Sequence, residues 1–165
     1  FIRKGIKWDV WLDNFKQGLK LPGGNEKMRL DITITGPGMF SLKELFDLSL
    51  ELDVSCETKI MFAFHPDIVF SPFAWPRHIL DRHIDELLAY MEPRATHRQQ
   101  SIINTLREMK NRPTFAEQWP DTYEQQFKNG KGYQDKLDSI RNEKLTIKDI
   151  YSRDTELLDW WTRYE

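Results

Sequence analysis

The sequence contains little cysteine, no long apolar segment and no large excess of either charge. Its single cysteine, Cys56, excludes an internal disulfide and offers a metal cluster one thiolate ligand. No run reaches the roughly 18 to 20 apolar residues that span a bilayer, so we expect no membrane partner. The 24 basic and 26 acidic residues give a net charge of −2, so we expect no general nucleic-acid binding. Together these absences favour a reducing, cytoplasmic location.

Several catalytic signatures are also missing. The chain has no Gly-x-Ser-x-Gly elbow, and Cys56 lies in no recognisable nucleophile motif. Residues 36–38 read Gly-Pro-Gly with no Lys-Ser or Lys-Thr after them, which excludes a phosphate loop. His78 and His83 are five residues apart, so a helix would place them about 140° apart around its axis. We therefore expect neither an all-histidine metal site nor a complete catalytic centre within this chain.

The first part of the chain has the pattern of a βαβ unit. Residues 28–35 alternate between apolar and polar side chains, as a strand does, and residues 59–65 have similar apolar spacing. Between them, residues 42–52 have helical periodicity, and Ser41 with Glu44 forms a possible capping box. A strand, a helix and a strand in this order predict a parallel pair with a right-handed crossover. A helix over residues 6–20 is expected to precede them.

The rest of the sequence is helical in pattern. Apolar residues recur at helical spacing from residue 77 to residue 91, and Glu92-Pro93 marks the strongest boundary. We therefore divide the chain into residues 1–92 and a helical C-terminal region, 93–165. Thr96 is a candidate helix cap, a short helix is expected after Trp119-Pro120, and a turn is expected at residues 129–132.

The polar side of the first strand is the candidate site. Asp31, Thr33 and Thr35 alternate with three apolar residues, so one face of the strand is polar. Ligands of parallel α/β proteins bind at the C-terminal ends of strands, which indicates residues 33–38 and 63–66. We expect the polar face to line a concave cavity. The alternative is a solvent-facing strand of an ordinary α+β domain.

The order of the segments resembles that of radical S-adenosylmethionine enzymes with a twitch-type C-terminal region. The resemblance is carried by residues 3–9, 30–35, 40–45, 64–67 and 136–142. It implies the C-terminal half of such an enzyme. The fold class it implies is α/β and helix-dominated, the C-terminal part of a partial (β/α)6 barrel with parallel strands, followed by a helical region.

The same resemblance implies the cofactors. In these enzymes a three-cysteine motif holds a [4Fe-4S] cluster, which binds S-adenosylmethionine and cleaves it to a 5′-deoxyadenosyl radical. Because this chain has only Cys56, the implied partner is a missing N-terminal half of the same protein. Family members often place an asparagine where Gly38 stands, and the backbone N–H groups of Gly36 and Gly38 are expected to replace that contact. The cofactor-binding residues implied are Thr33, Thr35, Gly36, Gly38, Phe64, His65 and Pro66.

Two other functions stay open at this point. One is a non-catalytic interaction module, a small α/β unit with a helical arm. The other is a complete enzyme of a different class. The residues name no substrate.

Overall fold

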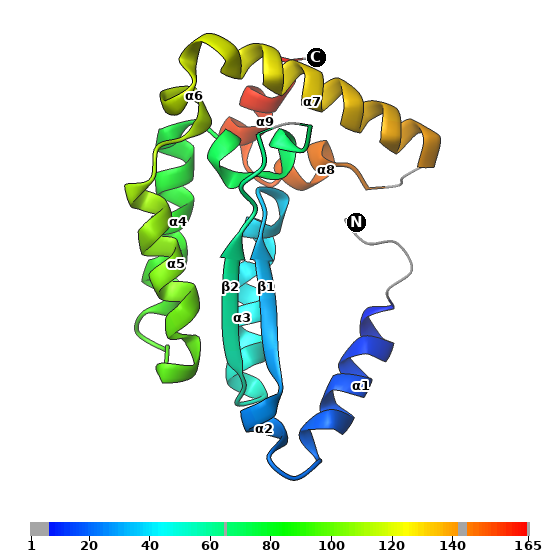
Figure 1. Ribbon diagram of the computed structural model, residues 1–165, viewed down its shortest axis with the longest axis vertical. Helices are drawn as coiled ribbons and strands as arrows, with labels where there is room; N and C mark the ends of the chain where they lie inside the picture. Colours follow the sequence, from blue (N-terminus) through cyan, green and yellow to red (C-terminus); the bar gives the residue numbers. More distant parts are fainter. Residues whose placement is uncertain (1–6, 65, 142–144, 165) are drawn as a thin grey trace.

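A computed structural model describes residues 7–64, 66–141 and 145–164, which form a helix-rich α/β structure (Figure 1). Helical turns η1 to η4 connect the longer elements. The helices are α1 (Trp8–Leu19), α2 (Gly24–Lys27), α3 (Leu42–Glu51), α4 (Arg77–Met91), α5 (Gln100–Asn111), α6 (Phe115–Gln118), α7 (Pro120–Arg141), α8 (Ile147–Tyr151) and α9 (Thr155–Thr162). The strands are β1 (Arg29–Ile34) and β2 (Ser55–Ile60), and the turns are η1 (Pro37–Ser41), η2 (Ile68–Phe70), η3 (Pro72–Ala74) and η4 (His97–Gln99).

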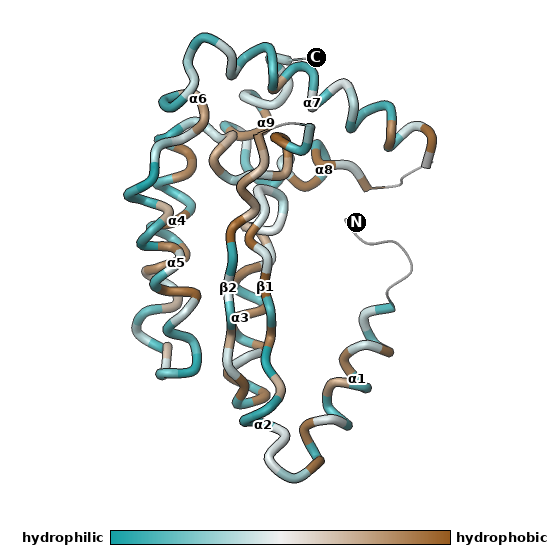
Figure 2. Tube along the Cα trace, viewed as in Figure 1, coloured by the Kyte–Doolittle hydropathy of each residue, from teal (hydrophilic) through white to brown (hydrophobic). Residues whose placement is uncertain are grey.

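The predicted βαβ unit is confirmed. β1 and β2 pair in parallel, with Leu30 opposite Cys56 and Ile34 opposite Ile60. Helix α3 connects the strands and lies behind them in Figure 1. Hydrophobic and hydrophilic residues alternate along β1 in Figure 2, and its burial alternates in the same way. One face of the strand is therefore buried and the other is exposed.

The predicted partial (β/α)6 barrel is wrong. The described residues contain a two-stranded sheet, β1 with β2, and two strands cannot tilt and close around a barrel axis. Residues 68–164 supply no further strand among those described, because their apolar positions recur at helical spacing. The division into residues 1–92 and 93–165 stays a prediction, and the buried core draws residues from both sides of it.

Two local predictions in the βαβ unit are also wrong. The second strand covers Ser55–Ile60 instead of 59–65, because β1 ends opposite Ile60 and Met61 is the last residue to bond to it. Beyond that point Phe62 and Phe64 pack against aromatic rings of the α6 region. The Ser41–Glu44 capping box is absent, because α3 continues directly from η1 and Ser41 makes no side-chain cap bond.

The predicted turn at residues 129–132 is wrong, because these residues lie within helix α7. The helix runs for 22 residues through these positions. Gly130 lies against η2, and a Cβ there would approach Ile68 Cγ2 to 2.5 Å. The glycine thus allows close packing within the helix and does not end it. Figure 2 shows mainly hydrophilic residues along α7, in keeping with its position on the outside of the molecule.

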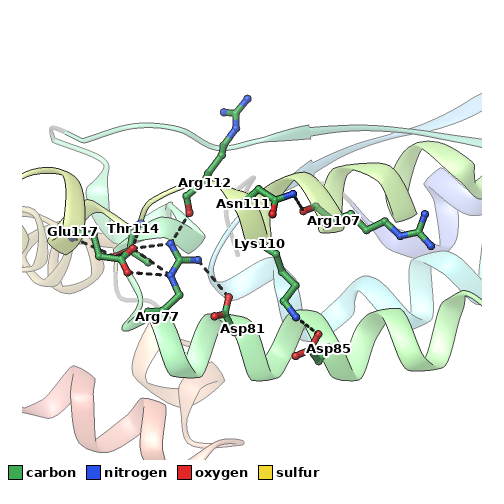
Figure 3. Close-up of polar contacts among 9 residues, drawn as sticks. All are labelled: Arg77, Asp81, Asp85, Arg107, Lys110, Asn111, Arg112, Thr114 and Glu117. Atoms are coloured by element: carbon green, nitrogen blue, oxygen red, sulfur yellow. Dashed lines mark hydrogen bonds and ion pairs between the residues drawn. The ribbon is translucent and has the colours of Figure 1, made fainter.

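Helices α4 and α5 have the expected apolar stripes and are joined by ion pairs at their outer surface. Arg77 on α4 pairs with Glu117 at 2.7 Å and with Asp81 at 3.3 Å, and Lys110 pairs with Asp85 at 2.6 Å (Figure 3). The Lys110–Asp85 pair connects α4 to α5 and the Arg77–Glu117 pair connects α4 to α6, while Arg77–Asp81 lies within α4. The last helix of the described residues is α9. No helix of the described residues is long and apolar enough to cross a membrane.

Candidate functional site

The two edges of the sheet differ in how their backbone groups are satisfied. On β2, the backbone N–H of Thr58 donates to Ser101 Oγ on α5 at 3.2 Å. The Thr58 hydroxyl also lies 2.6 Å from Thr105 Oγ1 on the same helix. Figure 1 shows α4 and α5 on this side of the sheet. A helix therefore covers the outer edge of β2 and takes the place of a third strand.

The outer edge of β1 has no strand beside it among the described residues. The carbonyl of Ile34 accepts a hydrogen bond from Met61 N at 2.8 Å. This bond shows which residues of β1 direct their backbone groups toward β2. In a parallel pair, alternate residues bond to the partner, so Leu30, Ile32 and Ile34 face β2. The N–H and C=O groups of Asp31 and Thr33 consequently point away from β2. No strand of the described residues pairs with these outward groups, which are the ones that another strand would use.

The polar face of the sheet is uncovered beside that edge. Asp31 pairs with Lys59 of β2 across the two strands, with 3.1 Å between Asp31 Oδ1 and Lys59 Nζ. Both side chains are more than half exposed, and Thr33 and Glu57 are exposed as well. On the opposite face, Leu30, Ile32 and Ile34 are buried. The sheet thus combines a covered apolar face with an open polar one.

Thr35 does not share the environment of Thr33. It is buried, and its Oγ1 accepts the backbone N–H of Gly38 at 3.0 Å. The N–H of Gly36 donates to the carbonyl of Phe70 at 2.8 Å. Both N–H groups expected to contact a cofactor therefore already have acceptors inside the chain.

The glycine at position 36 permits a close contact with two aromatic residues. A Cβ there would lie 2.8 Å from Tyr151 Oη and 3.0 Å from Trp75 Nε1. Those two atoms are themselves hydrogen-bonded at 3.0 Å, and both side chains are fully buried. Burial raises the pKa of the Tyr151 phenol above its ordinary range, so the hydroxyl remains protonated. The C-terminal end of β1 is closed by this pair.

The C-terminal end of β2 lies in a second aromatic cluster. Phe64 packs on Trp119 and Phe115, with ring centroids 4.5 and 5.4 Å apart. The carbonyl of Pro66 lies next to Gly130 of α7. His65 falls outside the described residues. Thr33 is therefore exposed on β1, while Thr35 and Gly36 are buried just after that strand. Phe64 is half-buried and Pro66 is exposed, so these two residues are only partly packed inside the chain.

Sequence reasoning missed a small polar cavity behind the end of β1. Its volume is about 250 Å³. His83 Nε2 lies 2.8 Å from Asp154 Oδ2, although the two residues are 71 positions apart in the chain. In the sequence, the only indication of this cavity was the two charged pairs Arg82-His83 and Arg153-Asp154. Their spacing does not predict that they meet in the fold. Its lining residues are Met39, Phe40, Lys43, Arg82, His83, Glu86, Leu87, Arg153 and Asp154.

A larger hollow of about 730 Å³ lies between α7, α8 and α9. Two of its lysines form ion pairs: Lys131 with Asp135 at 3.0 Å, and Lys128 with Glu124 at 2.8 Å. Lys131 also lies over the ring of Trp161. Among the described residues no group of histidine, cysteine, aspartate and glutamate side chains is arranged to hold a metal ion.

Comparisons with known proteins returned no matching family model, no matching curated protein and no matching solved structure.

Proposed function

We propose that this chain is the C-terminal part of a radical S-adenosylmethionine enzyme and supplies a wall of its cofactor and substrate cavity. The observation that carries the proposal is the asymmetry of the sheet. Its apolar face and the β2 edge are covered, while its polar face and the β1 edge are open. The segment order described above supports the same assignment.

The open edge gives the proposal its physical basis. Isolated two-stranded sheets are marginally stable in water, and unpaired edges attract further strands. A strand from the N-terminal half would bond to the outward backbone groups of Asp31 and Thr33. The polar face would then become the floor of an enclosed space. Thr33 and the Asp31–Lys59 pair would present hydroxyl, carboxylate and ammonium groups to a polar ligand.

The described residues do not fit an iron–sulfur cluster. Cys56 is the one cysteine of the sequence, it is buried on the apolar face of β2, and burial raises the pKa of its thiol. A [4Fe-4S] cluster needs several thiolates. In this proposal the cluster ligands therefore come from the N-terminal half, and this chain contributes only groups that bind and orient S-adenosylmethionine or substrate.

The role of each predicted site residue follows from its position. In this proposal Thr33 contacts the ligand, because it is exposed on the open face. Thr35, Gly36 and Gly38 hold the chain reversal after β1 in place. Phe64 and Pro66 remain candidates for contact with the adenosine part of S-adenosylmethionine. They lie beside an aromatic cluster in which Phe62 is about half exposed and packs on Phe115.

The test uses the polypeptide encoded together with the sequence that precedes Phe1. After anaerobic reconstitution, we expect a reduced cluster whose electron paramagnetic resonance spectrum changes when S-adenosylmethionine is added. Thr33→Val should weaken that response about tenfold, the effect of roughly one hydrogen bond. Thr122→Val, at an exposed position on α7, is the matched control and should leave it unchanged.

Two results would contradict the proposal. One is a preceding coding sequence without a three-cysteine motif. The other is a stoichiometric cluster formed by the 165-residue chain alone.

The open β1 edge also fits a second function, a non-catalytic module that adds a strand from another protein to its sheet. The same polypeptide separates the two. A module would bind a partner through β1 without a cluster and without any response to S-adenosylmethionine.

A further inference from the structure

The small cavity behind β1 is built from three separate parts of the chain. Lys43 comes from α3, Arg82 and His83 come from α4, and Arg153 and Asp154 follow α8. Glu86 of α4 and three apolar side chains, among them Phe40, complete the lining. A volume of about 250 Å³ suits one small polar group with a short attachment.

The carboxylates in this cavity are already matched to donors. Asp154 Oδ2 accepts from Arg82 at 2.8 Å and from His83 at 2.8 Å, and its Oδ1 accepts the N–H of Leu157 at 3.0 Å. Burial alone would raise the pKa of Asp154, but these donors outweigh it and lower the pKa. Glu86 lies 3.8 Å from Arg82. Asp154 and Glu86 therefore fix Arg82 and His83 in place.

Two cations of the cavity lack such a partner. Arg153 makes no ion pair and no side-chain hydrogen bond with any described residue, and Lys43 has no carboxylate partner there. The Lys43 ammonium lies 5.2 Å from the ring centre of Tyr90, a contact that leaves its hydrogen-bond donors unused. The cavity thus has two cationic side chains that form no ion pair with the described residues.

His83 adds a rigidly held imidazole. Its ring makes edge contacts with Phe40 and Trp75, with centroids 5.2 and 5.0 Å apart, and only 12% of its side chain is exposed. Nε2 is used by Asp154, while Nδ1 has no hydrogen-bond partner among the described residues. In a neutral ring whose Nε2–H donates to Asp154, Nδ1 is an acceptor, which can take a hydrogen bond from a protonated phosphate oxygen.

We propose that this cavity binds a phosphate group, with Lys43 and Arg153 as the charged donors and His83 as a positioned imidazole beside them. Charge-assisted hydrogen bonds from lysine and arginine are the usual means by which proteins hold phosphate oxygens. Because Arg82 already serves Asp154 and Glu156, it acts as a support for the site. Free phosphate and a small phosphate monoester present the same oxygens to such a site.

Titration calorimetry of the 165-residue chain with inorganic phosphate tests this site. We expect saturable binding that weakens at least about tenfold in Arg153→Gln, the loss of a charge-assisted hydrogen bond. Arg163→Gln removes the same charge from another exposed position near the C-terminus and should change the affinity less than about twofold. Arg153 is exposed, so its replacement should leave the thermal melt unchanged.

Further arms identify the source of the phosphate and the role of His83. If glycerol 3-phosphate binds more tightly than inorganic phosphate, and glycerol does not bind, the site holds a phosphate monoester. If inorganic phosphate binds more tightly, the site holds free phosphate. The imidazole resonances of His83 should shift on phosphate addition, while those of exposed His97 should not. Absence of saturable binding to the wild-type chain, or equal weakening by Arg163→Gln, would overturn the proposal.

Discussion

The two edges of one small sheet are treated in opposite ways. At β2, a side chain of α5 accepts a backbone N–H, and the edge is covered. At β1, alternate backbone groups point away from the sheet with no strand beside them among the described residues. The two faces differ in the same sense, since the apolar face is buried and the polar face is exposed. The chain therefore covers one side of its sheet with its own helices and leaves the other side open.

Neighbouring substitutions on the two faces of β1 should give the largest difference. Ile34 is fully buried, and Ile34→Ala should lower the free energy of unfolding by about 2–5 kcal/mol. Thr33 is exposed, and Thr33→Ala should change it by less than about 0.5 kcal/mol. Urea denaturation of both variants measures the difference. Similar losses in the two would mean that the polar face is also covered.

Substitution of two glycines tests whether the C-terminal end of β1 is closely packed. Gly36→Ala should cost about 1–3 kcal/mol, because its Cβ would press on Tyr151 and Trp75. Gly132→Ala, in helix α7, should stabilise the chain by about 0.5–1 kcal/mol, because no atom lies within 4 Å of its Cβ position. Thermal melts of the two variants should therefore shift in opposite directions. Unchanged stability in Gly36→Ala would show that the end of β1 is open enough for a ligand.

The covered edge can be tested at Ser101 of α5, which bonds to both the backbone N–H and the hydroxyl of Thr58. Ser101→Ala removes the acceptor of the Thr58 N–H and should cost about 1–2 kcal/mol. Asn104→Ala, on the exposed side of the same helix, is the control and should cost less than about 0.5 kcal/mol. Equal effects in denaturant titrations would show that α5 does not protect β2.

The smallest expected effect concerns acid pH and the ion pairs of Figure 3. The hydrogen bond from Arg77 lowers the pKa of Glu117 to about 2; burial opposes the shift and the Thr114 N–H assists it. A lowered pKa contributes stability above the ordinary value near 4.5, and that stability is lost as pH falls toward 2. Glu117 is nearly half exposed, so we expect a contribution of about 1 kcal/mol or less.

Comparison with Glu117→Gln isolates that contribution from those of other carboxylates. Between pH 4.5 and 2 the wild-type chain should lose slightly more stability than the variant. A parallel pH dependence in the two proteins would show that the pair contributes nothing measurable.

The sequence predicted those elements whose signal is local. Strict alternation over residues 28–35 and the helical stripe from Ile79 to Met91 were sufficient for β1 and α4. The sequence did not predict the start of β2, because Cys56 is a small residue that adds little to the apolar alternation. Its burial comes from pairing opposite Leu30 of β1, which the local sequence does not show. Gly130 indicated a turn because its packing partner, Ile68, lies far away in the chain.

The candidate sites were less predictable for the same reason. The polarity of Asp31 and Thr33 was visible in the sequence, but the open edge beside them depends on the absence of a third strand among the described residues. The His83–Asp154 contact joins residues 71 positions apart and follows from how α4 packs near the turn after α8. Local periodicity contains no information about such a contact.

Amide hydrogen exchange on β1 tests the central claim most directly. In the chain alone, the N–H groups of Asp31 and Thr33 should exchange quickly, while that of Ile32, which faces β2, should exchange slowly. In the polypeptide that includes the sequence preceding Phe1, Asp31 and Thr33 should become protected, as expected if a strand pairs with β1. Rapid exchange of both groups in a longer polypeptide that holds its cluster would contradict the account.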